Sequence, residues 1–266
     1  MIPPILLNPN ARARHCTLAP MFVRPADGEI LLIFTPIATS TELLTSLWNL
    51  LTADERERAN RFHFDEHRNR FIVGRAMLRT ILGTCVEAEP ASLEFAYGPH
   101  GKPCLERKER IGFNCSGSND SALYAISTGP DIGVDLEHIR PLDDMVKIAE
   151  RFFYPAEHRE LLALPERDRT KAFFDCWTRK EAFVKAVGEG LSHALDRFQV
   201  TLQPGQPAAF ISIDGVAGNE TNWALYDVAP PSGDYSAALA VRNKSSSLHL
   251  CTFESAIECL AQCRCI

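Results

Sequence analysis

Apolar positions follow two periods along the chain, and the two kinds of segment alternate. Alternation of period two predicts strands at 29–34, 93–97, 113–116, 122–127, 132–137, 198–202, 208–213, 223–228 and 235–241. Helical spacing predicts helices over 41–51, from the capping box Thr52-Ala53-Asp54-Glu55 onward, over 65–86, over 167–187 and over 255–263. Residues 1–20 are expected to be extended. The mixture predicts an α+β fold.

A short internal sequence repeat predicts two similar α/β subdomains related by a pseudo-twofold axis. Arg61-Phe62 followed by Glu66-His67-Arg68 recurs as Arg151-Phe152 followed by Glu157-His158-Arg159, and each copy precedes a long predicted helix. We place the boundary near Gly129, with subdomains at 1–129 and 130–266 in one compact unit. The turn at 128–131 is expected to join strands 122–127 and 132–137 as a hairpin.

Composition and charge narrow the function classes. The chain has 266 residues and a net charge of −6, which gives no compositional sign of nucleic-acid binding. No apolar run reaches membrane-spanning length, and the first residues lack the basic start of a signal peptide. The cysteine count is nine, an odd number. Together these features predict reduced thiols in a cytoplasmic protein. A metal site among the C-terminal cysteines is disfavoured, because no second ligand pair is near in sequence.

The stretch Gly133-Val134-Asp135-Leu136-Glu137 has strand periodicity, so Asp135 and Glu137 project from the same face. Adjacent carboxylates repel each other, and a cation between them relieves that repulsion. Hard oxygen ligands of this kind suit Mg²⁺ or Mn²⁺. The alternative interpretation is a solvated strand face that carries no ligand.

The helix predicted over 167–187 carries Glu181 and Lys185 four residues apart, which places both on one face. Trp177 lies one turn earlier on that face. Gly188 is suited to end the helix in the left-handed conformation. The following residues Glu189-Gly190-Leu191 allow close approach of the backbone to a ligand. The alternative is an ordinary surface ion pair, worth about 0.3 kcal/mol.

The two stretches together resemble the large, Sfp-type 4′-phosphopantetheinyl transferases. That family carries a G-[IV]-D-[IVL]-E strand and then W-[ST]-x-K-E-[AS]-x-x-K-x-x-G-x-G-L, and the resemblance here runs from about Arg56 to Leu202. It implies a monomer with coenzyme A bound in a cleft between the halves. It also implies transfer of the phosphopantetheine arm to a serine of an apo acyl carrier or peptidyl carrier protein, with release of adenosine 3′,5′-bisphosphate. Many large-type members serve secondary metabolite biosynthesis.

The resemblance also implies roles for individual residues. Asp135, Glu137 and Glu181 would hold Mg²⁺, and Mn²⁺ would suit the same ligands. Glu181, directly or through a water, would be the base for the carrier serine. Lys180 and Lys185 would contact the pyrophosphate, and Lys185 would stabilise charge on the leaving phosphate.

Four further residues match coenzyme A-binding positions of the family. Lys102, in Gly-Lys-Pro, would contact a phosphate, Arg61 and Arg70 would lie around the 3′-phosphate, and Ser116 matches the first serine of F-N-x-S-H-S. One position departs from the pattern. The histidine that follows this serine in the family, and that contacts the 3′-phosphate, is Gly117 here. This change implies weaker coenzyme A binding or a relaxed demand for the 3′-phosphate.

Two other functions remain open at this point. A non-catalytic coenzyme A or nucleotide-binding module is favoured by Gly117 and opposed by the intact carboxylates. An unrelated Mg²⁺-dependent phosphoryl or nucleotidyl transferase would share the carboxylates, but the chain has no Gly-rich phosphate loop.

Overall fold

The computed structural model describes residues 24–38, 40–106, 111–129, 131–188, 194–213, 222–242 and 247–253. The predictions for residues 1–20, for the segment 189–191 and for a helix over 255–263 fall outside these ranges. Within them, no helix is both long enough and apolar enough to cross a membrane. Among the cysteines in the described part, Cys104, Cys115 and Cys176 are free thiols.

The chain alternates between helices and strands, as the sequence pattern predicts. The first half contains β1 (Glu29–Pro36), α1 (Thr41–Trp48), α2 (Ala53–Asn60), α3 (Asp65–Cys85), η1 (Pro90–Ser92), β2 (Phe95–Tyr97), β3 (Pro103–Leu105), β4 (Gly112–Ser118) and β5 (Ser121–Ser127). The second half contains β6 (Ile132–His138), α4 (Met145–Phe152), α5 (Pro155–Ala163), α6 (Glu166–Val187), η3 (Leu195–Arg197), β7 (Phe198–Val200), β8 (Phe210–Ile213), β9 (Trp223–Val228), β10 (Tyr235–Arg242) and β11 (Ser247–Thr252).

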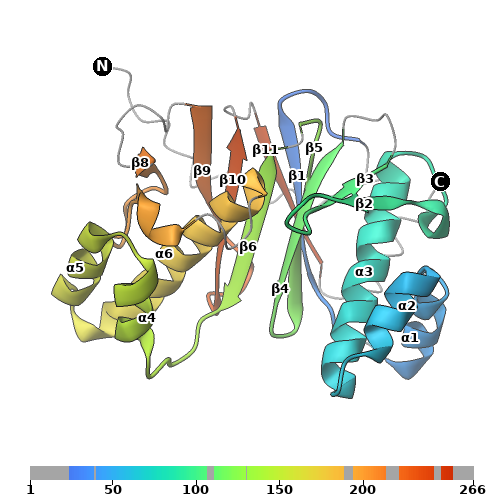
Figure 1. The fold of residues 1–266 in the computed structure, drawn as a ribbon, viewed down its shortest axis with the longest axis horizontal. Helices are drawn as coiled ribbons and strands as arrows, with labels where there is room; N and C mark the ends of the chain where they lie inside the picture. The colour runs from blue at the N-terminus through green and yellow to red at the C-terminus, as the bar shows by residue number, and fades with distance from the viewer. Residues whose placement is uncertain are drawn as a thin grey trace.

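Two sheets occupy the centre of the molecule, and helices cover their outer sides (Figure 1). The first sheet has the strand order β11-β1-β5-β4, and the second has the order β6-β10-β9. Helices α1–α3 pack on the first sheet and α4–α6 on the second. The long helix α3 therefore lies on the first sheet, and the long helix α6 lies on the second. The predicted α+β class is confirmed.

Three hydrophobic cores hold these layers together. One lies between α1–α3 and the first sheet, and a second lies between α4–α6 and the second sheet. The third lies between the two sheets, where β1 contributes Ile30 and Leu32 and β6 contributes Val134 and Leu136. Because side chains alternate along a strand, this inward face of β6 leaves Gly133, Asp135 and Glu137 facing the other way.

Local signals in the sequence set several helix boundaries. Thr52 N–H donates to the Glu55 carboxylate at 3.0 Å, as expected for the predicted capping box before α2. Pro155 occupies the first turn of α5, where its missing N–H costs nothing. Helix α6 ends at Gly188, which has φ 80° and ψ 15° in the left-handed region.

Strand pairing departs from the predictions in two places. The expected hairpin between strands 122–127 and 132–137 is wrong, because β5 pairs with β1 and β4 whereas β6 pairs with β10 in the other sheet. The real hairpin is β4–β5. Strand β11 was not predicted, and it pairs in parallel with β1. The segment 130–266 therefore returns one strand to the first sheet, and the division at residue 129 stays a prediction.

Gly133 lets α6 lie directly against β6, which makes Gly133→Ala a test of this packing. A Cβ atom at this position would overlap the backbone of Ala182 and Ala186. Overpacking of a core commonly costs 1–3 kcal/mol, and here backbone must move, so we expect a loss of about 3 kcal/mol or more. Urea unfolding measures the change. Gly233→Ala, where an added Cβ meets no heavy atom within 4 Å, is the control. Equal stability of the two variants would contradict the packing.

Candidate active site

The carboxylates predicted to hold a metal lie where β6 and α6 pack together. Asp135 is 3% exposed on β6, Glu137 lies two residues further along the same face, and Glu181 is half-buried on α6. Burial raises the pKa of Glu181, and the charges of Asp135 and Glu137, which lie close enough to act on it, raise it further. The structure therefore brings the three residues into one region.

Lys185 and Ser116 join this region from α6 and from β4. The Lys185 Nζ atom donates to Asp135 Oδ1 at 2.6 Å and to Ser116 Oγ at 2.9 Å. The Ser116 hydroxyl in turn donates to Asp135 Oδ1 at 2.9 Å. Three segments distant in sequence thus meet at one carboxylate oxygen. The helical spacing of four residues explains why Lys185 lies on the same face as Glu181.

Burial and crowded charge set the protonation behaviour of the cluster. Burial raises the pKa of Glu137 and of Glu181, and the charge of Asp135 raises both further. Burial would lower the pKa of Lys185, but the charge and hydrogen bond of Asp135 and the charge of Glu181 hold that pKa above its ordinary value. Lys185 is therefore an ammonium at neutral pH and partly offsets the negative charge.

The donor set fits a divalent cation by its chemistry. Asp135 Oδ2 is buried and accepts no hydrogen bond from any described residue, so it is an unpaired anionic oxygen beside two further carboxylates. Such oxygens are the ligands that Mg²⁺ and Mn²⁺ take. Among the described residues, however, no three His, Cys, Asp or Glu side chains already stand in a complete metal-binding arrangement. Oxygens from a phosphate ligand or a shift of side chains would have to complete the site.

Lys180 lies away from this cluster, although the resemblance places it on the pyrophosphate. Its side chain is fully buried and forms an ion pair of 2.8 Å with the equally buried Glu157. Its Nζ atom also donates to the carbonyls of Leu195 at 2.9 Å and Phe198 at 2.6 Å. An ammonium has three protons, and these three acceptors engage them. This geometry corrects the predicted phosphate contact and indicates a structural role.

Lys102 also differs from its predicted environment. Its Nζ atom donates to the carbonyls of Ile132 at 3.0 Å and Ala186 at 2.8 Å. Lys102 thereby connects the β2–β3 hairpin to the start of β6 and to the last turn of α6. Cations at a helix C-terminus are favoured by the helix dipole. A contact of Lys102 with a phosphate stays a prediction.

Lys102→Met is expected to change the pH dependence of stability. Burial lowers the pKa of Lys102 from 10.5 to about 8, against the opposing charge of Asp131. The unfolded chain therefore binds more protons than the folded one between these values, and stability rises with pH there. The free energy of unfolding of the wild type should increase relative to the variant between about pH 8 and about pH 10. If the free energies of unfolding of the wild type and of Lys102→Met changed in parallel with pH, this prediction would be contradicted. The control is Lys147→Met, which replaces an exposed lysine on α4.

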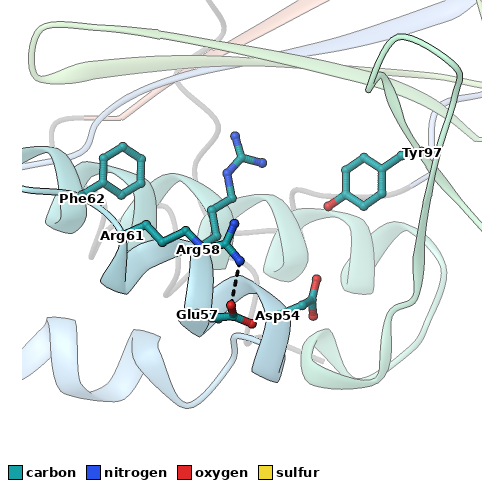
Figure 2. Close-up of a pocket in the computed structure, with 6 residues that line it drawn as sticks. All are labelled: Asp54, Glu57, Arg58, Arg61, Phe62 and Tyr97. Carbon is teal, nitrogen blue, oxygen red and sulfur yellow. Dashed lines mark hydrogen bonds and ion pairs between the residues drawn. The ribbon is translucent and has the colours of Figure 1, made fainter.

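The predicted arginines lie on the N-terminal half, in different settings. Arg61 is exposed, forms an ion pair with Glu57 at 2.7 Å, and lines a pocket of about 600 Å³. Figure 2 shows Phe62 and Tyr97 on opposite sides of this pocket, with arginine side chains between them. Arg70 is instead held by Glu66 and by Asp120, and its buried Nε atom has no partner in the part of the chain that the structure describes.

Sequence reasoning missed several residues that complete these sites. Arg58 of α2 lines the pocket with Arg61, which caps the end of that helix, and the spacing of three residues was the available signal. Tyr97 reaches the pocket from β2, which no local pattern predicts.

At Gly117 an added Cβ would meet only the carbonyl of Ser121 at 3.6 Å, so the backbone leaves room for a side chain there.

Comparisons with known proteins cover both halves of the chain. The family model of the 4′-phosphopantetheinyl transferase superfamily matches residues 131–240, and that of the 4′-phosphopantetheinyl transferase N-terminal region matches residues 37–128. The 4′-phosphopantetheinyl transferase HetI of Nostoc sp. strain PCC 7120 is 39% identical over 207 residues, which covers 77% of this chain and 84% of that protein.

Two further relatives agree with this match. A putative 4′-phosphopantetheinyl transferase of Synechocystis sp. is 38% identical over 189 residues, covering 70% of this chain and 75% of that protein. The 4′-phosphopantetheinyl transferase Sfp of Bacillus subtilis strain 168 is 33% identical over 159 residues, covering 59% of this chain and 70% of that protein. The similarity therefore extends over most of each relative.

Proposed function

The chain belongs to the 4′-phosphopantetheinyl transferase superfamily, and on that basis we propose that it transfers the phosphopantetheine arm of coenzyme A to a serine of an apo carrier protein. The observation that supports this most directly is the cluster around Asp135, where Lys185 of α6 and Ser116 of β4 meet beside Glu137 and Glu181. Phosphoryl-type transfer needs both negative ligands for a cation and a positive group for the phosphates.

Asp135, Glu137 and Glu181 are the residues that would hold Mg²⁺, with Mn²⁺ as the alternative. The unpartnered and buried Asp135 Oδ2 supports this assignment. When bound, the cation would supply neutralising charge for the pyrophosphate of coenzyme A. Lys185, as an ammonium, adds positive charge next to the same carboxylate.

In the proposed reaction the serine Oγ atom of the carrier attacks the phosphorus that carries the pantetheine arm. A new oxygen–phosphorus bond forms, and the bond to the second phosphate breaks. Adenosine 3′,5′-bisphosphate leaves with the electron pair. Glu181, directly or through a water, takes the serine proton, and its raised pKa suits a base that works near neutral pH. Lys185 stabilises the charge on the leaving phosphate.

The nucleotide end of coenzyme A is proposed to lie on the N-terminal half. The pocket lined by Arg58 and Arg61 offers guanidinium groups, which bind phosphate in a forked geometry. Arg70, with a buried Nε atom that lacks a partner, is the second proposed phosphate contact. We propose Ser116 as a further contact near the pyrophosphate, because its hydroxyl already binds Lys185.

The partner is proposed to be an apo acyl carrier or peptidyl carrier protein. Carrier proteins are usually acidic, and the arginines of α2 and α3 offer electrostatic attraction for such a partner. We further propose that the enzyme acts as a cytoplasmic monomer and serves secondary metabolite biosynthesis.

The test separates an enzyme from a coenzyme A-binding module, which Gly117 favours as the second candidate. The protein, Mg²⁺ and coenzyme A are incubated with several apo carriers, and released adenosine 3′,5′-bisphosphate is quantified by chromatography. Release in proportion to added carrier is the expected result. Coenzyme A binding in calorimetry, without release for any carrier, would instead select the binding module.

A further inference from the structure

Polar side chains on β4 connect the two sheets along one line. Asn114, Ser116 and Ser118 alternate along this strand, and each contacts β6. Asn114 Oδ1 accepts the N–H of Val134 at 2.9 Å. The two serine contacts each join residues 19 positions apart, so β4 and β6 run alongside each other in the same direction. Both strands are edges of their own sheets.

Each of the two serines donates a hydrogen bond to one oxygen of a carboxylate on β6. Ser116 donates to Asp135 Oδ1, and within the described ranges the other oxygen, Oδ2, has no hydrogen-bond partner. Ser118 donates to Glu137 Oε2 at 3.0 Å, and the structure records no hydrogen bond to Oε1 among the described residues. Each carboxylate is thus held by one oxygen and leaves the other oxygen available as a ligand.

The hydroxyl of Ser118 is fixed from both sides. It donates to Glu137 and accepts the backbone N–H of His138 at 3.0 Å, so its orientation is determined. Arg140 also lies near Glu137, but its Nη1 atom is 4.0 Å from Oε2 and its side chain is half-exposed. Ser118 is therefore the closer restraint on a carboxylate that the charge of Asp135 would otherwise push away.

We propose that Ser118 is a positioning residue that orients Glu137 as a cation ligand from the opposite half of the molecule. This inference rests on the proposed function, and it makes the cation site depend on the docking of β4 against β6. Partners of metal ligands commonly change metal affinity or activity by 10–100-fold when they are removed. A merely structural hydrogen bond would instead change stability and leave cation affinity unaltered.

The test compares Ser118→Ala, Ser118→Thr and the wild type, with Ser92→Ala as the control. Ser92 also makes one hydrogen bond, to the carbonyl of Glu89, but lies exposed in η1. Mn²⁺ affinity is measured by calorimetry with coenzyme A present, and the Mg²⁺ dependence of carrier modification gives KM and kcat. Thermal unfolding reports on stability.

Ser118→Ala is expected to weaken Mn²⁺ binding and raise the KM for Mg²⁺ by about 10-fold, while kcat at saturating Mg²⁺ changes little. Ser118→Thr keeps the hydroxyl and should restore both values, and Ser92→Ala should match the wild type. Unchanged Mn²⁺ affinity in Ser118→Ala, or a lower melting temperature as its only effect, would overturn the proposal. A wild type that binds Mn²⁺ but modifies no carrier would contradict the proposed function, while the Mn²⁺ affinities still decide the role of Ser118.

Discussion

Glu181→Gln is expected to lower the rate of carrier modification by about 10³-fold, because general-base catalysis alone contributes 10²–10⁴-fold. The substitution keeps the shape of the side chain and removes the anionic oxygen that would take the serine proton. It also removes one of the three carboxylates proposed to hold Mg²⁺. Glu181 is half-buried at the surface of the cluster, so the fold should remain intact.

The measurement for Glu181→Gln is the initial rate of holo-carrier formation at saturating coenzyme A and Mg²⁺. Glu166→Gln, on an exposed position of the same helix, is the matched control and should retain the wild-type rate. A Glu181→Gln variant within a few-fold of the wild type would show that another group accepts the serine proton and that the third carboxylate is dispensable.

Lys180→Met is expected to destabilise the protein by about 3–5 kcal/mol, because it leaves a buried carboxylate without its partner. Lys180 and Glu157 are both fully buried, and Glu157 also accepts the N–H of Val200 and of Tyr154. Loss of the ammonium therefore affects α5, α6 and β7 together. Urea unfolding measures the free energy.

The pH dependence of this variant has a definite sign. Burial already raises the pKa of Glu157, and the charge of Lys180 lowers it in part. Without Lys180 the pKa of Glu157 in the folded state rises further, so the destabilisation grows as pH rises above the unfolded value and shrinks as pH falls. Lys180→Met combined with Glu157→Leu should recover part of the loss. If Lys180 bound the pyrophosphate instead, the single variant would keep its stability and lose coenzyme A affinity.

Periodicity predicted the part of the site that lies within single elements. Alternation along β6 placed Asp135 and Glu137 on one face, and the four-residue spacing on α6 placed Glu181 with Lys185. The same helical geometry explains why Lys180 lies elsewhere: consecutive helical residues are about 100° apart, so Lys180 points away from the face of Glu181. The family motif shows that a lysine stands at position 180, but it does not show which way the side chain points.

Contacts between segments that are far apart in sequence could not be predicted from the sequence pattern. The side of β6 that meets β4, and hence the role of Ser118, depends on how two sheet edges lie together. The same holds for strand pairing. Strand β11 pairs in parallel with β1, and β5 and β6 belong to different sheets, so the pairing depends on strands that are far apart in sequence. A turn signal such as the one at 128–131 predicts a change of direction, but it does not determine which strand the next segment joins.

The proposed transfer is tested most simply by the intact mass of an apo carrier protein after incubation with this protein, coenzyme A and Mg²⁺. We expect the carrier to gain the mass of one phosphopantetheine arm on its serine, and we expect Glu181→Gln or omission of the divalent cation to prevent the gain. A carrier panel that gains no mass with the wild type, although calorimetry shows bound coenzyme A, would contradict it.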